Sequence, residues 1–161
     1  MKWVDVLRDK SLQDLPYKLE LNDRGQIVMS PTSNRRGMLQ AKMGTLLDKL
    51  VKKGQVITEC SIDTPEGVKV ADVVWASASF IKEHEYQTPY PQSPEICVEI
   101  SSPSNSEQEV RDKITLYLAK GAQEVWVCDE EGRVAFYNHS GEIKKSKLAA
   151  RFPAKLQPGL P

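Results

Sequence analysis

Residues 94–104 read PEICVEISSPS, an apolar, strand-like run that carries an acid, Glu99, at its centre. Successive side chains of a strand point to opposite faces, so Glu99 shares a face with Ser101 while Ile100 points to the other. A carboxylate among buried strand residues loses its hydration, and it must become neutral, meet a cation or bind a metal. We therefore expect a strand over residues 95–101 whose acid has a specific partner.

A second acid, Asp72, has the same kind of surroundings in residues 68–75, VKVADVVW. If the two strands belong to one sheet, Asp72 and Glu99 can face the same side and bring two carboxylates together. Mg²⁺ takes oxygen ligands of this kind, and bound Mg²⁺ activates water and stabilises charge in phosphodiester hydrolysis. The pair suggests a metal site. In the structural alternative, each acid is bound to an internal Arg or Lys.

The periodicity of the whole chain predicts an α/β fold whose central order is helix, three strands, helix, strand. Residues 106–109, SEQE, form a capping-box pattern that opens the second of these helices, and Gly121 closes it. The expected elements are a helix over 2–13, strands over 17–21 and 26–30, an amphipathic helix over 35–53, strands over 55–62, 68–75 and 95–101, a helix from 106 to 121, a strand over 124–129, a hairpin of 134–138 and 142–147, and an irregular end over 152–161.

The composition is typical of one globular domain spanning residues 1–161, with 40 % hydrophobic residues and no long apolar segment. Residues 1–6, MKWVDV, lack the apolar core of a signal peptide, so we expect a cytoplasmic protein that does not enter a membrane. The three cysteines stand apart in apolar runs and are expected to be reduced core residues. His84 and His139 are far from other ligand-type residues and are expected in solvated loops.

Charge is distributed unevenly along a chain whose formal net charge is zero. Residues 61–110 hold 9 acids and 2 basic residues, whereas residues 1–60 hold 11 basic residues and 7 acids. Basic flanks around an acidic centre, with a basic face on the helix over 35–53, suit a phosphate backbone held over a metal. Ordinary scatter of surface charge explains such a pattern at least as often.

Several motifs together resemble a known family. They are residues 29–34, MSPTSN; 70–73, VADV; 94–104, PEICVEISSPS; 113–117, KITLY; and 121–126, GAQEVW. The order of elements resembles the PD-(D/E)XK nuclease superfamily, and the motifs are similar, over roughly residues 17 to 152, to the Uma-type restriction endonucleases. This resemblance implies a restriction-endonuclease-like core, a central mixed β-sheet flanked by helices in αβββαβ order, with an added N-terminal hairpin and a C-terminal β-hairpin.

The resemblance also implies roles for individual residues. Asp72 and Glu99 would be catalytic acids that bind Mg²⁺ (or Mn²⁺), with the backbone carbonyl of Ile100 as a third ligand. Ser101 replaces the superfamily's usual lysine two residues after the second acid. Lys113, on the shoulder of the apolar stripe of the next helix, would take over that lysine's catalytic role. Its alternative is a lysine that extends past the edge of the core to solvent.

Three further positions are candidates for contact with the substrate. Arg36 stands where family members often have a histidine, Gln40 stands where the superfamily tends to have an acid, and Ser101 shares the face of Glu99. Gln40 could hold a water or a phosphate oxygen, or be a solvated helix residue. Glu20 also matches a recurring family acid and could approach the site or pair with a lysine. Glu95 lies near the start of its strand and is left out of the site.

The resulting hypothesis is a Mg²⁺-dependent endonuclease that hydrolyses the phosphodiester bonds of DNA, with a homodimer expected by analogy. The alternative is a catalytically inactive nuclease-fold module that binds nucleic acid or a protein partner, because a chain can keep an architecture after losing turnover.

Overall fold

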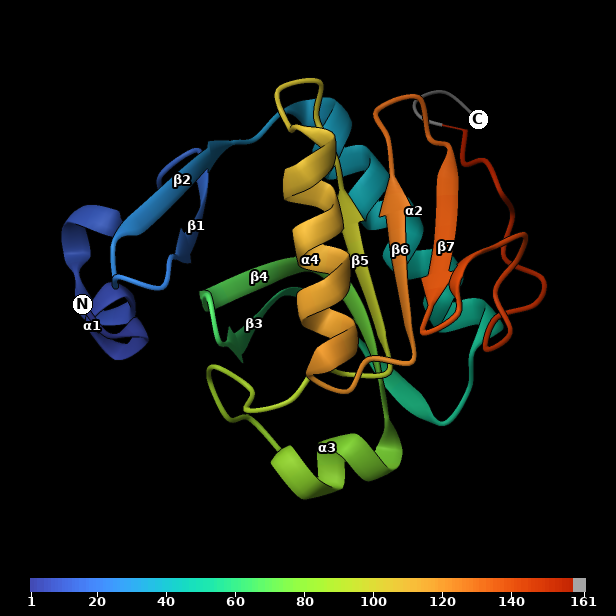
Figure 1. Ribbon diagram of the computed structural model, residues 1–161, viewed down its shortest axis with the longest axis horizontal. Helices are drawn as coiled ribbons and strands as arrows, with labels where there is room; N and C mark the ends of the chain where they lie inside the picture. Colours follow the sequence, from blue (N-terminus) through green and yellow to red (C-terminus); the bar gives the residue numbers. More distant parts are fainter. Residues whose placement is uncertain (158–161) are drawn as a thin grey trace.

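The computed structural model describes residues 1–157 and contains a mixed six-stranded sheet with helices on both faces (Figure 1). The sheet order is β3-β4-β5-β6-β7-β8, in which β5 and β6 are parallel and all other neighbours are antiparallel. The elements are α1 (Trp3–Arg8), η1 (Lys10–Leu12), β1 (Tyr17–Leu21), β2 (Ile27–Pro31), α2 (Asn34–Leu50), β3 (Gly54–Thr64), β4 (Gly67–Ser77), α3 (Ala78–His84), β5 (Ile96–Ile100), α4 (Glu107–Ala119), β6 (Glu124–Cys128), β7 (Val134–Asn138) and β8 (Gly141–Ile143). The predicted α/β core is confirmed.

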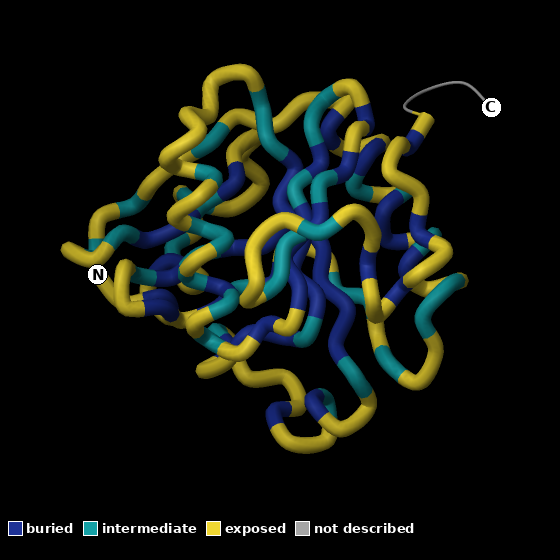
Figure 2. Tube along the Cα trace, turned by 45° about the vertical axis from the view of Figure 1, so that its right-hand side comes forward, coloured by how far each residue is buried: buried dark blue, intermediate teal, exposed yellow. Residues whose placement is uncertain are grey.

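Strand alternation divides the apolar core into two layers, one on each face of the sheet. On one face, α2 packs Leu39, Met43 and Leu47 against side chains such as Val98 and Trp126. On the other face, α3 and α4 cover a second cluster, which includes Val74, Cys97 and Tyr117. Figure 1 shows α4 in front of the sheet and α2 behind it. In Figure 2, buried segments run through the middle of the molecule and exposed segments surround them. Glu99 has the parity of Cys97 and lies on the α4 side. At Asp72 the alternation is interrupted, because its neighbours Ala71 and Val74 both belong to this second cluster.

The two long helices begin where a serine caps them. Ser33 accepts a hydrogen bond from the N–H of Arg36 at the start of α2, and Ser106 accepts one from Glu109 at the start of α4. Such caps satisfy N–H groups that have no partner within the first turn. Because Arg36 is the third residue of α2, this cap also fixes the position from which the Arg36 side chain extends.

The strands β1 and β2 form a separate two-stranded sheet that lies beside the body of the molecule with α1 (Figure 1). Trp3 and Leu21 pack against Val68 and Val70 of β4 and close a third apolar cluster. The turn between β3 and β4 touches β1 so closely that a Cβ on Gly67 would lie 2.2 Å from the Leu21 carbonyl oxygen. Only glycine fits there, and its φ of +96° is also one that glycine adopts readily. This contact holds β1 over the start of β4.

Several elements differ from the sequence-based expectation. The helix predicted over 2–13 is two pieces, because the Asp9 carboxylate accepts from the N–H of Ser11 and begins η1 anew. The helix α3, capped by Ser77, was not predicted. It contains His84, which is buried against Phe80 rather than solvated in a loop. The last hairpin strand, β8, ends at Ile143 and is shorter than expected.

The expectations for the cysteines and for His139 are met. The three cysteines are free and buried, and burial raises the pKa of the Cys60 thiol to about 12. His139 lies exposed in a turn after β7. Within residues 1–157, no helix combines the length and the apolar character needed to cross a bilayer. Part of the end predicted as irregular, residues 158–161, lies outside the described residues.

Candidate active site

Asp72 and Glu99 meet where β4 and β5 separate. The two strands pair from Trp75 with Ile96 to Val73 with Val98, and the next residues along are the two acids. Here the ladder ends, and the Asp72 Oδ2 atom accepts the backbone N–H of Ile100 at 2.7 Å. Asp72 is 3 % exposed and Glu99 7 % exposed. The predicted pair of buried carboxylates therefore exists, at the open end of two neighbouring strands.

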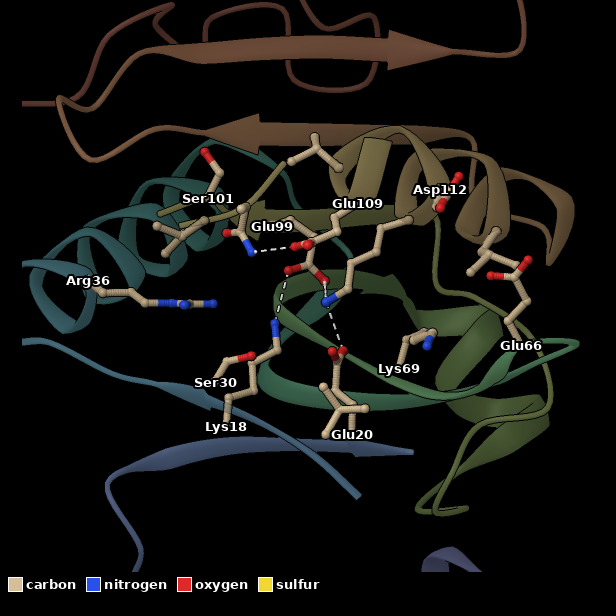
Figure 3. Close-up of a pocket in the computed structure, with 16 residues that line it drawn as sticks. Lys18, Glu20, Ser30, Arg36, Glu66, Lys69, Glu99, Ser101, Glu109 and Asp112 are labelled. Atoms are coloured by element: carbon tan, nitrogen blue, oxygen red, sulfur yellow. Dashed lines mark hydrogen bonds and ion pairs between the residues drawn. The ribbon is translucent and has the colours of Figure 1, made fainter. Parts of the chain in front are cut away.

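A lysine that the sequence analysis missed lies between these two acids. The Lys18 Nζ atom, supplied by β1, is 3.2 Å from Asp72 Oδ1 and 2.9 Å from Glu99 Oε2. Figure 3 shows Lys18 pointing toward Glu99. Lys18 lies two residues before Glu20 in a strand, so the two side chains share a face. That parity was the available signal, because Glu20 was already a candidate.

Glu20 and Lys113 complete a second ion pair beside the first. The Lys113 Nζ atom is 2.8 Å from Glu20 Oε2 and 3.3 Å from Glu99 Oε1. The same Glu20 oxygen accepts the N–H of Val70 at 2.7 Å, which ties the acid to β4. Lys113 was the predicted catalytic lysine, on the shoulder of the apolar stripe of its helix, and in the structure it contacts Glu99. Its side chain remains 22 % exposed, so it is the most accessible of the charged groups that contact these acids.

The helix α2 contributes two side chains that hold Asp72 from the other direction. The Arg36 Nη2 atom donates to both Asp72 oxygens at 3.0 Å, and the Gln40 Nε2 atom donates to the Asp72 backbone carbonyl at 3.0 Å. Arg36 is buried and Gln40 half-buried. Both had been candidates for substrate contact, and in the structure both contact Asp72.

Two further residues frame Glu99. The Tyr117 hydroxyl, from the KITLY motif, was not among the predicted site residues, and it donates to Glu99 Oε1 at 2.6 Å. Tyr117 follows Lys113 by one helical turn, so both face the same acid. Ser101 lies on the cavity wall, and its N–H donates to the Cys128 carbonyl at 2.8 Å. Glu95, left out of the site, accepts from Ser77 at the start of α3.

The site balances three carboxylates against three cations, and this balance shifts the pKa values of its members. Burial would raise the pKa of Glu99, but Lys113 and Lys18, with the Tyr117 hydroxyl, lower it to about 2. Burial and the neighbouring charge of Glu99 raise the pKa of Asp72, and Lys18 and Arg36 offset only part of this. Burial would lower the pKa of Lys18, but the two acids raise it above its ordinary value. Lys18 is therefore charged at neutral pH.

A cavity of about 220 Å³ leads from solvent to these groups (Figure 3). Lys18, Glu20, Arg36 and Glu99 line it from the inside, and Lys113 lines its wall. The cavity is also lined by three further acids and one further lysine, from the β3–β4 turn, β4 and α4: Glu66, Lys69, Glu109 and Asp112.

The donor set fits a hard divalent cation in part. The Asp72 Oδ1 and Glu99 Oε2 atoms converge on one buried position, now held by an ammonium group, and carboxylate oxygens are ligands that Mg²⁺ accepts. Among residues 1–157, no three His, Cys, Asp or Glu side chains are grouped to hold a metal ion. Glu20, the third acid nearby, is engaged by Val70 and Lys113 instead. A metal here would take two carboxylates and complete its shell with backbone, water or phosphate oxygens.

Comparison with known proteins agrees with this architecture. The model of the Uma2 family, described as "Putative restriction endonuclease", matches residues 9–158. Among solved structures, the chain is similar to a "putative nuclease belonging to DUF820" from Anabaena variabilis, with a TM-score of 0.69, 20 % sequence identity and 86 % of each chain covered. No curated protein matches the chain.

Proposed function

Since the chain belongs to the Uma2 family of restriction endonuclease-like proteins, we propose that it is a Mg²⁺-dependent endonuclease acting on DNA phosphodiester bonds. The observation that carries this proposal is the convergence of Asp72 Oδ1 and Glu99 Oε2 on one buried cation position at the inner end of a solvent-connected cavity. Buried charged groups with perturbed pKa values are concentrated at functional sites.

In this proposal, Asp72, Glu99 and the Ile100 carbonyl would hold Mg²⁺ or Mn²⁺. The bound metal would supply an activated water and stabilise charge on the phosphate. Asp72 is oriented for this by the Ile100 N–H and by Arg36. Hydrogen bonds that fix a ligating carboxylate in this way keep its orientation when the cation arrives.

Lys113 is the proposed catalytic lysine. Its ammonium contacts Glu99 and lies at the cavity wall with part of its surface accessible. There it can orient the attacking water or meet developing negative charge, which is the role that Ser101 cannot perform. Arg36, Gln40 and Ser101 lie beside the acids or on the cavity wall, where a phosphate oxygen would approach. Exposed basic residues of α2, with Arg35 and Lys49 among them, are candidates for contact with neighbouring phosphates.

A second candidate function is a nuclease-fold module that binds nucleic acid or a protein without turnover. The observation in its favour is that every acid of the site already has a cationic partner. Cleavage of both DNA strands would suit a two-fold homodimer, which sedimentation of the purified protein would reveal.

A cleavage assay distinguishes these functions. Single- and double-stranded DNA is incubated with Mg²⁺ or Mn²⁺ and with the parent, Asp72→Asn, Glu99→Gln or Lys113→Ala. Asp63→Asn, an exposed acid of β3 outside the cavity, is the matched control. We expect metal-dependent cleavage by the parent and the control only. A parent that binds DNA but never cleaves it would favour the module.

Lys113→Ala separates catalysis from metal binding. Because Asp72 and Glu99 remain, we expect the affinity for Mg²⁺ to be nearly retained while the cleavage rate falls roughly a hundredfold. Calorimetry and single-turnover cleavage measure the two quantities independently. An unchanged rate would return Lys113 to a purely structural ion pair with Glu20.

A further inference from the structure

Lys18 occupies the position at which the two proposed ligand oxygens converge. Its ammonium contacts Asp72 Oδ1 and Glu99 Oε2, and its side chain is 6 % exposed. A metal that binds these same two oxygens would bring a divalent charge into the space of this ammonium. The two cations would repel each other strongly at such a distance in a buried site. Metal binding and the observed position of Lys18 are therefore mutually exclusive.

The charges of the site favour replacement of the Lys18 ammonium by a divalent cation over binding of the cation beside it. Glu20, Asp72 and Glu99 carry three negative charges, and Lys18, Arg36 and Lys113 carry three positive ones. Adding a divalent cation to this neutral set would leave two uncompensated positive charges. If Lys18 withdraws, the set carries one positive charge, which one phosphodiester anion would neutralise. A phosphodiester is the substrate that the proposed function requires.

The cavity offers the Lys18 ammonium a second, hydrated position. Lys18 lines the cavity with Ser30, its partner residue on β2. A lysine ammonium sits on a flexible four-carbon stem, so it can be hydrated by rotation of the side chain alone. Arg36, in contrast, is fixed by two hydrogen bonds to Asp72 and extends from a capped helix. Among these cations, Lys18 can leave the acids without disturbing the backbone.

We propose that Lys18 is an internal counter-ion: it holds the divalent-cation position between Asp72 and Glu99 in the metal-free protein and withdraws into the cavity when the cation binds. This inference rests on the proposed function, because it requires a metal at these two acids. It adds a residue of β1 that competes with the metal and so sets its affinity. The separate hairpin of β1 and β2 then has a role in the site beyond covering β4.

Calorimetry with Mg²⁺ and Mn²⁺ tests the competition directly. Lys18→Met keeps the length of the side chain and removes its charge, so the metal no longer has to displace an ammonium. We expect the metal to bind Lys18→Met at least about tenfold more tightly than the parent. Lys69→Met is the matched control, because Lys69 lines the same cavity without an ion pair to Asp72 or Glu99 among residues 1–157. Its affinity should change much less.

A measurement on the parent protein covers the case in which Lys18→Met does not fold. Lysines are acetylated with an N-hydroxysuccinimide ester, with and without saturating Mg²⁺, and the labelled sites are quantified by mass spectrometry. We expect Mg²⁺ to increase labelling of Lys18 several-fold relative to exposed Lys10, since the ammonium leaves its buried position. Lys113 keeps Glu20 as a partner and should change little.

The outcomes distinguish this inference from the proposed function. If the parent binds metal, but Lys18→Met binds it equally or less tightly and Lys18 labelling does not rise, the exchange is wrong and the metal site stands. If neither the parent nor Lys18→Met binds Mg²⁺ or Mn²⁺, both the metal site and the exchange are wrong. Tighter binding by Lys18→Met that is lost in the Lys18→Met, Asp72→Asn double variant would support both.

Discussion

Two parts of this sheet bury carboxylates, and they stabilise them in different ways. Glu124, at the start of β6, is 2 % exposed and accepts hydrogen bonds at 2.6 to 3.2 Å. Its donors are the indole of Trp126, the hydroxyl of Ser146 and the backbone N–H groups of Lys147 and Leu148. All of them are neutral, and two belong to the backbone. Glu124 therefore anchors the segment after β8 to the sheet.

Asp72 and Glu99 have a different set of donors. Apart from the Ile100 N–H and the Tyr117 hydroxyl, their partners are the charged ends of Lys18, Arg36 and Lys113. A backbone donor cannot leave without unfolding the segment, whereas a lysine ammonium can. Burial of a carboxylate therefore does not by itself indicate a metal site. The nature of its donors decides whether the acid is a fixed anchor or is able to exchange one cation for another.

The strongest test of this difference replaces each carboxylate by its amide. We expect Asp72→Asn and Glu99→Gln to lower metal-dependent DNA cleavage by roughly a thousandfold, because each removes a proposed metal ligand. Glu124→Gln should keep the parent rate per folded molecule, since Glu124 does not line the cavity. The folded fraction of each variant, measured by near-UV circular dichroism, corrects for unfolded protein. Equal losses in all three variants would mean that the distinction between anchor and site is wrong.

Stability should change in the opposite order. Glu124→Ala leaves several buried donors without an acceptor, so we expect the free energy of unfolding to fall by at least about 3 kcal/mol. Asp72→Asn should cost less, because the amide keeps an oxygen that can accept the Ile100 N–H, and Lys18 and Arg36 line the cavity, where they can be hydrated. Urea unfolding at pH 7 measures both. A larger loss for Asp72→Asn would show that its pairs with Lys18 and Arg36 are structural.

The pH dependence of the unfolding free energy tests the ionisation of Glu99. Its folded-state pKa is lowered to about 2 from an ordinary value of 4.5, so its ionisation stabilises the fold above pH 4.5, and this contribution is lost as the pH falls toward 2. The shift corresponds to about 3 kcal/mol. The difference in unfolding free energy between the parent and Glu99→Gln should therefore be constant from pH 7 to pH 5 and shrink below that. A difference that is independent of pH down to 3 would contradict the ion-paired state of Glu99.

Much of this site could be predicted because strand parity is a local property. Asp72 and Glu99 stand in apolar runs, and the apolar stripe of α4 placed Lys113 near the sheet. The structure brings all three together. Lys18 was missed because its strand belongs to a second sheet, which is placed over β4 by contacts such as that of Glu20 with the Val70 N–H and that of Leu21 with Val68. Such a contact between distant segments leaves no periodic trace in the sequence.

Other differences have the same origin. Arg36 and Gln40 were candidates for substrate contact because they match positions of the family resemblance; the structure adds that both contact Asp72, which the helix pattern alone does not indicate. The helix α3 was missed because it has only seven residues, too few for a clear amphipathic pattern. Its cap, Ser77, is fixed by the side chain of Glu95, 18 residues later in the chain. His84 is consequently buried where the sequence suggested a loop.

The smallest expected effects come from single hydroxyl groups that donate to each kind of carboxylate. Tyr117→Phe removes one donor from Glu99, but Lys113 still contacts the same oxygen, so we expect a loss of about 1 kcal/mol in unfolding free energy. Ser146→Ala removes a donor to Glu124 and also the acceptor for the N–H of Ala149, so its loss should be about 2 kcal/mol.

For the affinity for Mg²⁺, we expect the opposite order: Tyr117→Phe should have the larger effect and Ser146→Ala the smaller one. The Tyr117 hydroxyl stabilises negative charge on Glu99, so Tyr117→Phe should change the calorimetric affinity for Mg²⁺, whereas Ser146→Ala should leave it at the parent value. If Tyr117→Phe costs more stability than Ser146→Ala and does not alter metal affinity, Glu99 is a neutral-donor anchor like Glu124. The exchangeable character of the site would then rest on Asp72 and Lys18 alone, because those two groups have no hydroxyl partner among residues 1–157.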